Sequence, residues 1–591
     1  MAVGREWPGT RASVRHPPIP SRLNTTLAFD RPRSARTASR PARGKIMIRH
    51  ALAVASIAVC LSLDAASLFA EPIASATTIK RPRGERPSIV LDSGIAPADV
   101  ERRPYRDYVA SCLDSLMEYG TDQYGGVRQP MLVPMLDVRD KRRPESPRES
   151  PTRWRSFGRF DGCEPLSDQP LVEVFHLLSQ RTGERKYARF ADSYLRCLTN
   201  LTCDKNLFWW GTHRCYDPEK DAMISTKDNH HEINLPSVRW EHLWRVNPEA
   251  TRAAIEAIWQ WHVFDKDTGE HNRHANAKRG RAFPISGGAF VHAFAFLYSK
   301  TKEPEHLDWA RRVADHHWQH RDSTTGLLPG QTGSGRDRFD GRHSDTSVTG
   351  IYCYYLLKSH ELTGNTTFRD QALAYLTAYA RHGYDPKSGK FFGSLRLDGT
   401  PEPGPRARNG YERSEARGFI DLWEPIQLAY EYPIYTAQAY AYAYQATGDR
   451  LMLETAKRWA EWIRRDPPSK GCLIAPAQYA DYARRYGRHG TYADKYGRTV
   501  SLFVHLYALT GQRAYLDDAQ EMAREAVSKL YYEGLFRGHP ASAHYSTLDG
   551  VGFLLRALVQ LDAALEDPES VVGAKSIRLN ERGDQIGFDN W

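Results

Sequence analysis

The chain of 591 residues is 41% hydrophobic, which is enough for a large core and excludes wholesale disorder. Its formal charge of +10 would suit a nucleic-acid partner if that charge were spread over the folded part. It is not, because residues 1–46 hold ten basic and two acidic side chains and so account for +8 of the charge. We therefore expect no nucleic-acid partner.

The first two segments resemble leader sequences rather than parts of a fold. Residues 1–46 are rich in Pro, Ser and Arg without apolar periodicity, so we expect a disordered basic extension that precedes the true start at Met47. Residues 47–70 combine a basic start, an apolar run of about a dozen residues and small residues at the end, which predicts a signal peptide. The run is too short for a stable membrane span, so we expect periplasmic or extracellular export.

A two-helix unit repeats through residues 104–566, after an extended lead-in at 71–103. Each unit is an apolar helix, a short turn that is often Thr-Gly, and an amphipathic helix. The turns recur every 55 to 84 residues, at Thr182, Val246, Thr301, Thr363, Thr447 and Thr510. One helical hairpin fills such a period. Residues 567–591 are expected to form a polar C-terminal tail.

The two helices of a unit differ in their apolar pattern. Residues 456–463 place apolar side chains at helical spacing opposite a charged face, which is typical of an outer ring. Residues 435–444 are apolar around more of the helix, which favours an inner ring. If 104–119 pairs with 545–564, seven inner and seven outer helices result. We predict an all-α (α/α)7 toroid, with an (α/α)6 toroid as the nearest alternative and an open solenoid as the third.

Polar side chains concentrate between residues 205 and 285. The clusters are Gly211-Thr-His213, Asn229-His230-His231-Glu232 and Asn272-Arg273-His274. Two or more imidazoles with a carboxylate suit a divalent transition metal such as Mn, Co, Ni or Zn. The alternative is packing of histidine and aromatic rings at the mouth of the ring. The motifs G-x-S-x-G and H-E-x-x-H are both missing.

These clusters and three later motifs resemble the periplasmic pectate lyases of polysaccharide lyase family 2, over roughly residues 105–565. The later motifs are Tyr496-Gly-Arg498, Gly538-His539-Pro540 and Asp549-Gly-Val-Gly552. The resemblance implies a seven-hairpin toroid that holds a transition metal through two His and one Glu beside an Arg base. It implies that the metal ligands are His213, Glu232 and His274 and that the base is Arg273. His230 or His231 is an alternative ligand, because the spacing from His213 to Glu232 looks short.

β-Elimination explains these residue types. Cleaving a 4-linked uronate requires removal of the C5 proton beside the carboxylate, and a metal with cationic side chains stabilises the charge that develops. Arg is an awkward base, since its pKa lies above about 12. Burial among cations, with Arg279 or Arg281 nearby, would favour the neutral form. Otherwise Tyr496 or Lys495 takes the proton, and Arg273 only pairs with the substrate.

Further uronate carboxylates need charged or hydrogen-bonding partners. The substrate-binding candidates are Arg279, Arg417, Tyr496, Arg498 and His539. Each of them could equally belong to a structural ion pair or hydrogen bond.

The leading hypothesis is a secreted, monomeric polysaccharide lyase that cleaves an acidic polysaccharide, pectate or polygalacturonate first, by metal-assisted β-elimination. A glycoside hydrolase or sugar epimerase on an (α/α) toroid is the enzyme alternative, with Glu424, Asp161 and Asp549 as the suspected acids. A carbohydrate-binding helical-repeat protein without catalytic activity is the third reading.

Overall fold

The computed structural model describes the chain in two stretches, 94–144 and 162–591. The second stretch has gaps at 203–204, 212–213, 226–229, 234–237, 276–278, 280–281, 334–340, 403–416, 424–431 and 471–489. The chain divides into Met1–Gly84 and Glu85–Trp591, and only the second unit contains described residues. The expected basic extension and signal peptide therefore lie outside the description.

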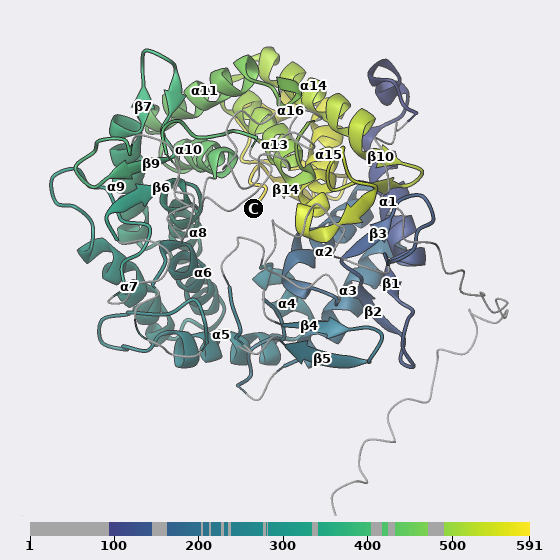
Figure 1. Cartoon of the computed structure of the whole chain (residues 1–591), viewed down its shortest axis with the longest axis horizontal. Coiled ribbons are helices and arrows are strands. Elements are labelled where there is room, and N and C mark those ends of the chain that lie inside the picture. The colour runs from purple at the N-terminus through teal and green to yellow at the C-terminus, as the bar shows by residue number, and fades with distance from the viewer. Residues whose placement is uncertain are drawn as a thin grey trace, which may run out of the picture. The chain divides into compact units, whose positions relative to one another are not determined.

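Helices of Glu85–Trp591 alternate between an inner and an outer layer (Figure 1). The inner helices are α2 (Pro165–Thr182), α4 (Trp240–Val246), α6 (Pro284–Thr301), α8 (Cys353–Thr363), α10 (Pro433–Thr447), α13 (Ala493–Thr510) and α15 (Val551–Glu566). The outer helices are α1 (Tyr105–Tyr119), α3 (Arg185–Asn200), α5 (Pro248–His262), α7 (Pro304–Gln319), α9 (Thr366–His382), α11 (Arg450–Arg465) and α14 (Arg513–Leu530). Shorter helical turns are η1 (Pro97–Arg102), η4 (Val348–Tyr352), η6 (Pro468–Lys470), η8 (Thr547–Asp549) and α16 (Pro568–Val571).

Contacts between the inner helices close the ring. Helix α15 packs between α2 and α13, and the series continues through α10 and α8 to α6. The short α4 fills the remaining place, because His242 stacks on His176 of α2 at 4.7 Å and Trp244 contacts Phe296 of α6 at 6.0 Å. The outer helix α1 packs against α15. Within the described residues the ring thus has seven hairpins, which confirms the predicted all-α toroid.

Burial explains the difference between the two layers. Helix α10 buries every residue from Pro433 to Ala443, because both of its faces meet other helices. Helix α11 buries one stripe, which includes Met452, Trp459 and Ile463. Across the part of the chain that is described, no helix combines the length and the apolar character needed to cross a bilayer.

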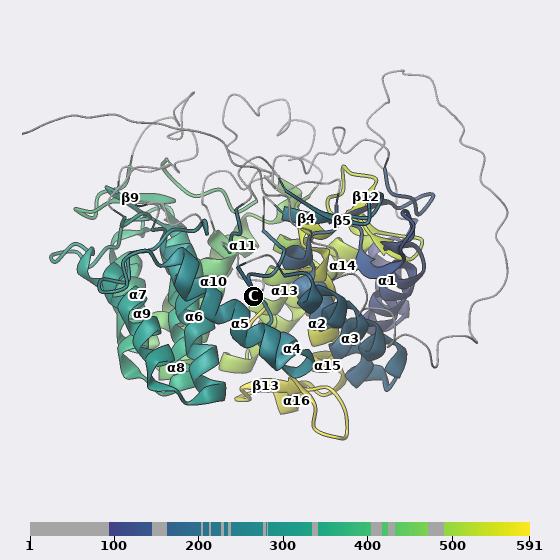
Figure 2. The same cartoon turned by 90° about the horizontal axis from the view of Figure 1, so that it is seen from below.

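The two rims of the ring differ in the length of their connections. Inner-to-outer turns have one or two residues, whereas outer-to-inner connections have 20 or more. The strands form antiparallel pairs: β1 (Thr121–Asp122) with β2 (Gln129–Leu132), β3 (Met135–Asp137) with β12 (His544–Ser546), β4 (Arg214–Asp217) with β5 (Ala222–Ser225), β6 (His343–Asp345) with β9 (Ser394–Arg396), β7 (Tyr384–Asp385) with β8 (Lys390–Phe391), β10 (Tyr531–Tyr532) with β11 (Leu535–Phe536), and β13 (Ser576–Arg578) with β14 (Gln585–Gly587). Figure 2 shows β4 and β9 at the rim with the long connections and β13 at the opposite rim.

The C-terminal segment enters the ring, and Figure 1 places its end at the centre. The Trp591 ring stacks on Tyr354 with 3.7 Å between centroids. The Arg239 guanidinium donates to the Trp591 main-chain oxygen. The sequence suggested only a polar tail here, but five of its large apolar side chains are buried inside the protein: Ile577, Leu579, Ile586, Phe588 and Trp591. Their spacing follows neither a helix nor a long strand, so periodicity alone did not reveal them.

Candidate active site

Glu232 and His274 lie side by side on two of the long connections. Their main chains form an isolated antiparallel bridge, and both side chains are buried. His274 Nε2 lies 3.5 Å from Glu232 Oε1, and Arg273 Nε lies 3.4 Å from the same oxygen. The structure thus brings together Glu232, Arg273 and His274, whereas the expected third ligand, His213, lies outside the described residues.

Gly211 packs directly against the Glu232 main chain. Its φ is +101°, and a Cβ at this position would lie 2.8 Å from the Glu232 main-chain oxygen and 2.9 Å from its nitrogen. Only glycine allows both the backbone conformation and this approach. Gly211 precedes His213 by two residues, and its N–H donates to Glu164 Oε1 over 3.3 Å.

Glu164, which precedes α2, is a buried carboxyl that the sequence analysis missed. Burial is the main cause that raises its pKa well above the usual range, and the Asp168 and Glu232 carboxylates add to it. These surroundings therefore favour the protonated form of Glu164 over the carboxylate. The only local signal at this position is the following Pro165, which marks the start of a helix rather than a site.

The two histidines considered as alternative ligands have different surroundings, and hydrogen bonds fix the tautomer of His231 only. The His230 ring stacks on His274 with 4.9 Å between centroids. His231 Nδ1 lies 2.8 Å from His262 Nε2, and His262 Nδ1 lies 2.9 Å from the Asn272 main-chain oxygen. A carbonyl oxygen only accepts, so His262 Nδ1 donates to it and His262 Nε2 accepts from His231 Nδ1. This assignment leaves the lone pair of His231 on Nε2, where it could bind a metal.

Arg273 is buried, with its guanidinium 5.1 Å from the centroid of the Phe283 ring. Burial favours the neutral guanidine, whereas the nearby Glu232 carboxylate favours the charged form. Of the two cations expected nearby, Arg279 is exposed and Arg281 lies outside the described residues.

The alternative bases differ from Arg273 in their surroundings. The Tyr496 hydroxyl donates to Glu525 Oε1 over 2.8 Å. Burial, followed by the Glu525 carboxylate, raises the pKa of Tyr496 well above its usual value. Tyr496 is therefore protonated at neutral pH, and the structure argues against the expected tyrosinate base. Lys495 is buried too.

Arg498 is fully buried inside the ring. Its guanidinium lies between the rings of Tyr435 and Phe553, at 3.7 Å and 3.8 Å from their centroids. It also donates to the main-chain oxygen of Asn590. The C-terminal segment thus supplies a partner for this predicted substrate-binding residue.

Arg417 and His539 also have partners within the chain. Arg417 Nη1 donates to Glu402 Oε1 over 2.5 Å, and the same carboxylate accepts from Arg396 and contacts His343. His539 Nδ1 accepts from the main-chain N–H two residues later, and its ring contacts Tyr492 at 4.7 Å. Of the acids suspected for a hydrolase, Asp549 is fully buried, and Asp161 and Glu424 lie outside the described residues.

The donor set at Glu232 and His274 fits a transition metal. Two ligand atoms at about 2.1 Å from a tetrahedral ion are about 3.4 Å apart. The 3.5 Å between His274 Nε2 and Glu232 Oε1 meets this spacing. A further group of potential metal ligands, Glu303, Glu305 and His306, lies at the turn between α6 and α7.

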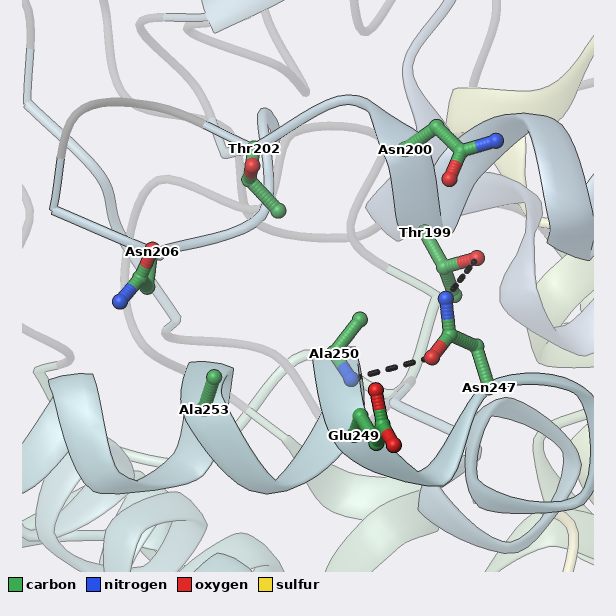
Figure 3. Close-up of a pocket in the computed structure, with 8 residues that line it drawn as sticks. All are labelled: Thr199, Asn200, Thr202, Asn206, Asn247, Glu249, Ala250 and Ala253. Atoms are coloured by element: carbon green, nitrogen blue, oxygen red, sulfur yellow. Dashed lines mark hydrogen bonds between the residues drawn. The ribbon is translucent and has the colours of Figure 1, made fainter.

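A polar pocket of about 300 Å³ lies between α3 and α5 (Figure 3). Asn247 lies at one side of it, where its Nδ2 donates to Thr199 Oγ1 over 3.4 Å and its Oδ1 accepts from Ala250 N over 3.1 Å. The eight lining residues are Thr199, Asn200, Thr202, Asn206, Asn247, Glu249, Ala250 and Ala253. None of these eight was predicted as a site residue.

Known proteins resemble parts of this chain. The chain shares 29% identity over 171 residues with a pectate disaccharide-lyase of Dickeya dadantii (strain 3937), covering 27% of this chain and 29% of that protein. A family 76 glycoside hydrolase from a bovine Bacteroides thetaiotaomicron strain is 13% identical, with a TM-score of 0.41 and 78% coverage of both chains. Cellobiose 2-epimerase from Bacillus thermoamylovorans B4167 is 12% identical, with a TM-score of 0.40 and coverage of 61% of this chain and 86% of its own.

The sequence matches are to a pectate lyase family model and to a pectate disaccharide-lyase, whereas the structural likenesses are too weak to indicate an activity. The stretch aligned with the curated relative is less than a third of that relative. Residues 151–285 match the family model described as periplasmic pectate lyase, which confirms the resemblance seen in the sequence and covers Glu232, Arg273 and His274.

Proposed function

We propose that the protein is an exported polysaccharide lyase that cleaves a polyuronate, pectate first, by metal-assisted β-elimination. The observation that carries this proposal is the single oxygen, Glu232 Oε1, that lies near both His274 Nε2 and Arg273 Nε. A metal ligand and a candidate base are thereby adjacent, inside the region that matches the lyase family model.

The metal would be held by His213, Glu232 and His274, with His231 as the alternative imidazole. When bound there, a divalent transition metal supplies a Lewis acid that polarises the substrate carboxylate and stabilises negative charge beside C5. The Asn272 side chain orients this site, because its Oδ1 accepts from the His274 N–H over 3.0 Å. Glu164 supports it through Gly211.

Arg273 is the proposed base. Its guanidine must be neutral to accept the C5 proton, and burial favours that form. Proton loss from C5 then leads to departure of the 4-oxygen and an unsaturated uronide end. Arg279, six residues further and exposed, is the proposed partner for a substrate carboxylate.

An assay on polygalacturonate tests the proposal. The expected result is a rise in the ultraviolet absorbance of unsaturated uronides that stops on addition of a chelator and returns with Mn²⁺ or Zn²⁺. Arg273→Ala should abolish the rise while the folded protein still binds metal. Full elimination activity in Arg273→Ala would refute the assignment of Arg273 as the base.

A hydrolase is the second candidate, because burial raises the pKa of the Glu164 carboxyl and the Glu232 carboxylate raises it further. A carboxylic acid and a carboxylate are the pair that such enzymes use. New reducing ends without the absorbance rise, lost in Glu164→Gln, would support hydrolysis and reject the lyase.

A further inference from the structure

We infer that the turn between α6 and α7 binds a second divalent transition-metal ion, through Glu303, Glu305 and His306. One ligand atom from each of these side chains lies within 4.8 Å of the other two. The turn belongs to the rim with short connections, away from the connections that carry Glu232. The inference does not depend on the proposed lyase activity.

His306 supplies the observation that distinguishes this cluster from a group of surface acids. Its side chain is fully buried, and its Nε2 has no hydrogen-bond partner among the described atoms. That nitrogen lies 3.6 Å from Glu303 Oε2 and 4.0 Å from Glu256 Oε1. Ligands of a tetrahedral ion are about 3.4 Å apart, so the 3.6 Å separation needs only a small adjustment.

Thr301 fixes which nitrogen of His306 carries the proton. Its hydroxyl donates to the Leu297 main-chain oxygen over 3.0 Å and accepts from the Glu303 N–H over 3.3 Å. One acceptor position remains on Thr301 Oγ1, and His306 Nδ1 lies 2.8 Å from it. His306 therefore donates from Nδ1 and directs the lone pair of Nε2 at the carboxylates. Metal-binding imidazoles are oriented by this kind of hydrogen bond.

The charges around His306 leave room for a divalent cation. Arg252 binds Glu256 through Nε at 2.7 Å and Glu303 through Nη2 at 2.8 Å. With Glu305, three carboxylates face one guanidinium, which leaves a net charge of −2. Each carboxylate oxygen has a second lone pair, so the arginine does not occupy every acceptor position.

The ligand types select the class of ion. Calcium and magnesium prefer ligand sets made entirely of oxygen, whereas an imidazole nitrogen with carboxylates suits Zn²⁺, Mn²⁺, Co²⁺ or Ni²⁺. Glu256 belongs to the outer helix α5, and His306 to the outer helix α7. Glu256 is not one of the three proposed ligands, but its Oε1 lies 4.0 Å from His306 Nε2, so a bound ion would lie next to the contact between two neighbouring hairpins.

Equilibrium dialysis of the purified, tag-free chain against ZnCl₂ tests the site. Glu232→Gln is the reference protein, since it weakens the proposed catalytic site. We expect this variant to retain one zinc per chain, and CaCl₂ in tenfold excess not to displace it. A Glu232→Gln protein that binds no zinc would overturn the inference, whatever the result for elimination activity.

Substitutions in the reference protein locate the ion. His306→Gln should abolish binding of the remaining zinc. Thr301→Val should lower the zinc affinity about 10- to 100-fold, because the His306 imidazole loses the hydrogen bond that orients it. Glu305→Gln keeps the test open if His306→Gln does not fold, because Glu305 is exposed and should fold normally. We expect at least tenfold weaker zinc binding from this change. Unchanged zinc affinity in Glu305→Gln and in every folded His306 variant would place the ion elsewhere.

Discussion

Gly211→Ala tests whether the contact between Gly211 and Glu232 sets the geometry for chemistry. The added Cβ would lie 2.8 Å and 2.9 Å from Glu232 main-chain atoms, whereas ordinary contact begins at 3.4 Å. Backbone atoms cannot rotate away as a side-chain tip can. The two segments must therefore separate by about 0.5 Å, which displaces Glu232 from Arg273 and His274.

Gly364→Ala is the matched control. Gly364 also has a positive φ, +70°, but a Cβ there would meet no atom within 4 Å. In both variants a non-glycine residue at positive φ lowers the unfolding free energy by about 1–3 kcal/mol. Only Gly211→Ala moves the site. A displacement of 1 Å near reacting groups costs about 100-fold in rate, so half of that predicts about a tenfold lower kcat/KM.

Initial rates of unsaturated uronide formation should be compared at equal amounts of folded protein, with urea unfolding as the measure of stability. We expect Gly211→Ala to lose more stability than Gly364→Ala, because it adds the contact with Glu232 to the backbone cost that both variants share. We expect a lower kcat/KM per folded molecule in Gly211→Ala alone. Equal kcat/KM values in the two folded variants would refute the reasoning that this backbone contact positions Glu232.

Two further predictions concern stability. Trp591→Ala should lower the unfolding free energy, measured in urea, by about 3–5 kcal/mol, because a buried indole stacked on Tyr354 is lost. Trp591→Phe should retain most of the parent's stability. Equal stability of Trp591→Ala and the parent would contradict this packing. Burial raises the pKa of Asp168 from 3.8 to about 7, so stability of the parent should fall as pH rises between these values, by at most about 1.4 kcal/mol per pH unit. The unfolding free energy of Asp168→Asn, measured by urea titration at each pH, should lack this fall. A variant whose stability depends on pH as steeply as the parent's would contradict the role of Asp168.

The fold was predictable because each hairpin carries its own signal. Apolar periodicity and the turns at Thr363 and Thr447 recur along the chain, and seven units follow from them. Closure of the ring through α1 and α15 also followed from the pattern, since each was a helix without a neighbour to pair with. The C-terminal segment was not predictable, because Phe588 and Trp591 are buried by the interior of the ring rather than by residues near them in sequence.

The residues of the candidate site also fall into a group that the sequence could reveal and a group that it could not. Glu232, Arg273 and His274 stand in local clusters of unusual composition, so the sequence could single them out. Glu164 and His262 act through hydrogen bonds to residues that are 47 and 31 positions away. No local pattern marks such residues, because only the packing of separate connections brings them together.

The proposed location of the site would explain why the family model matches only part of the ring. Glu164, Gly211, Glu232 and His274 come from three successive outer-to-inner connections, all of which overlap residues 151–285. Metal binding and proton transfer require particular atoms at particular distances, so these connections tolerate few residue types. Most positions of the later hairpins serve to close the ring, and many apolar sequences with the right volume can do so. A family-model match over residues 151–285 is what a toroid with the proposed catalytic sector at these connections would show.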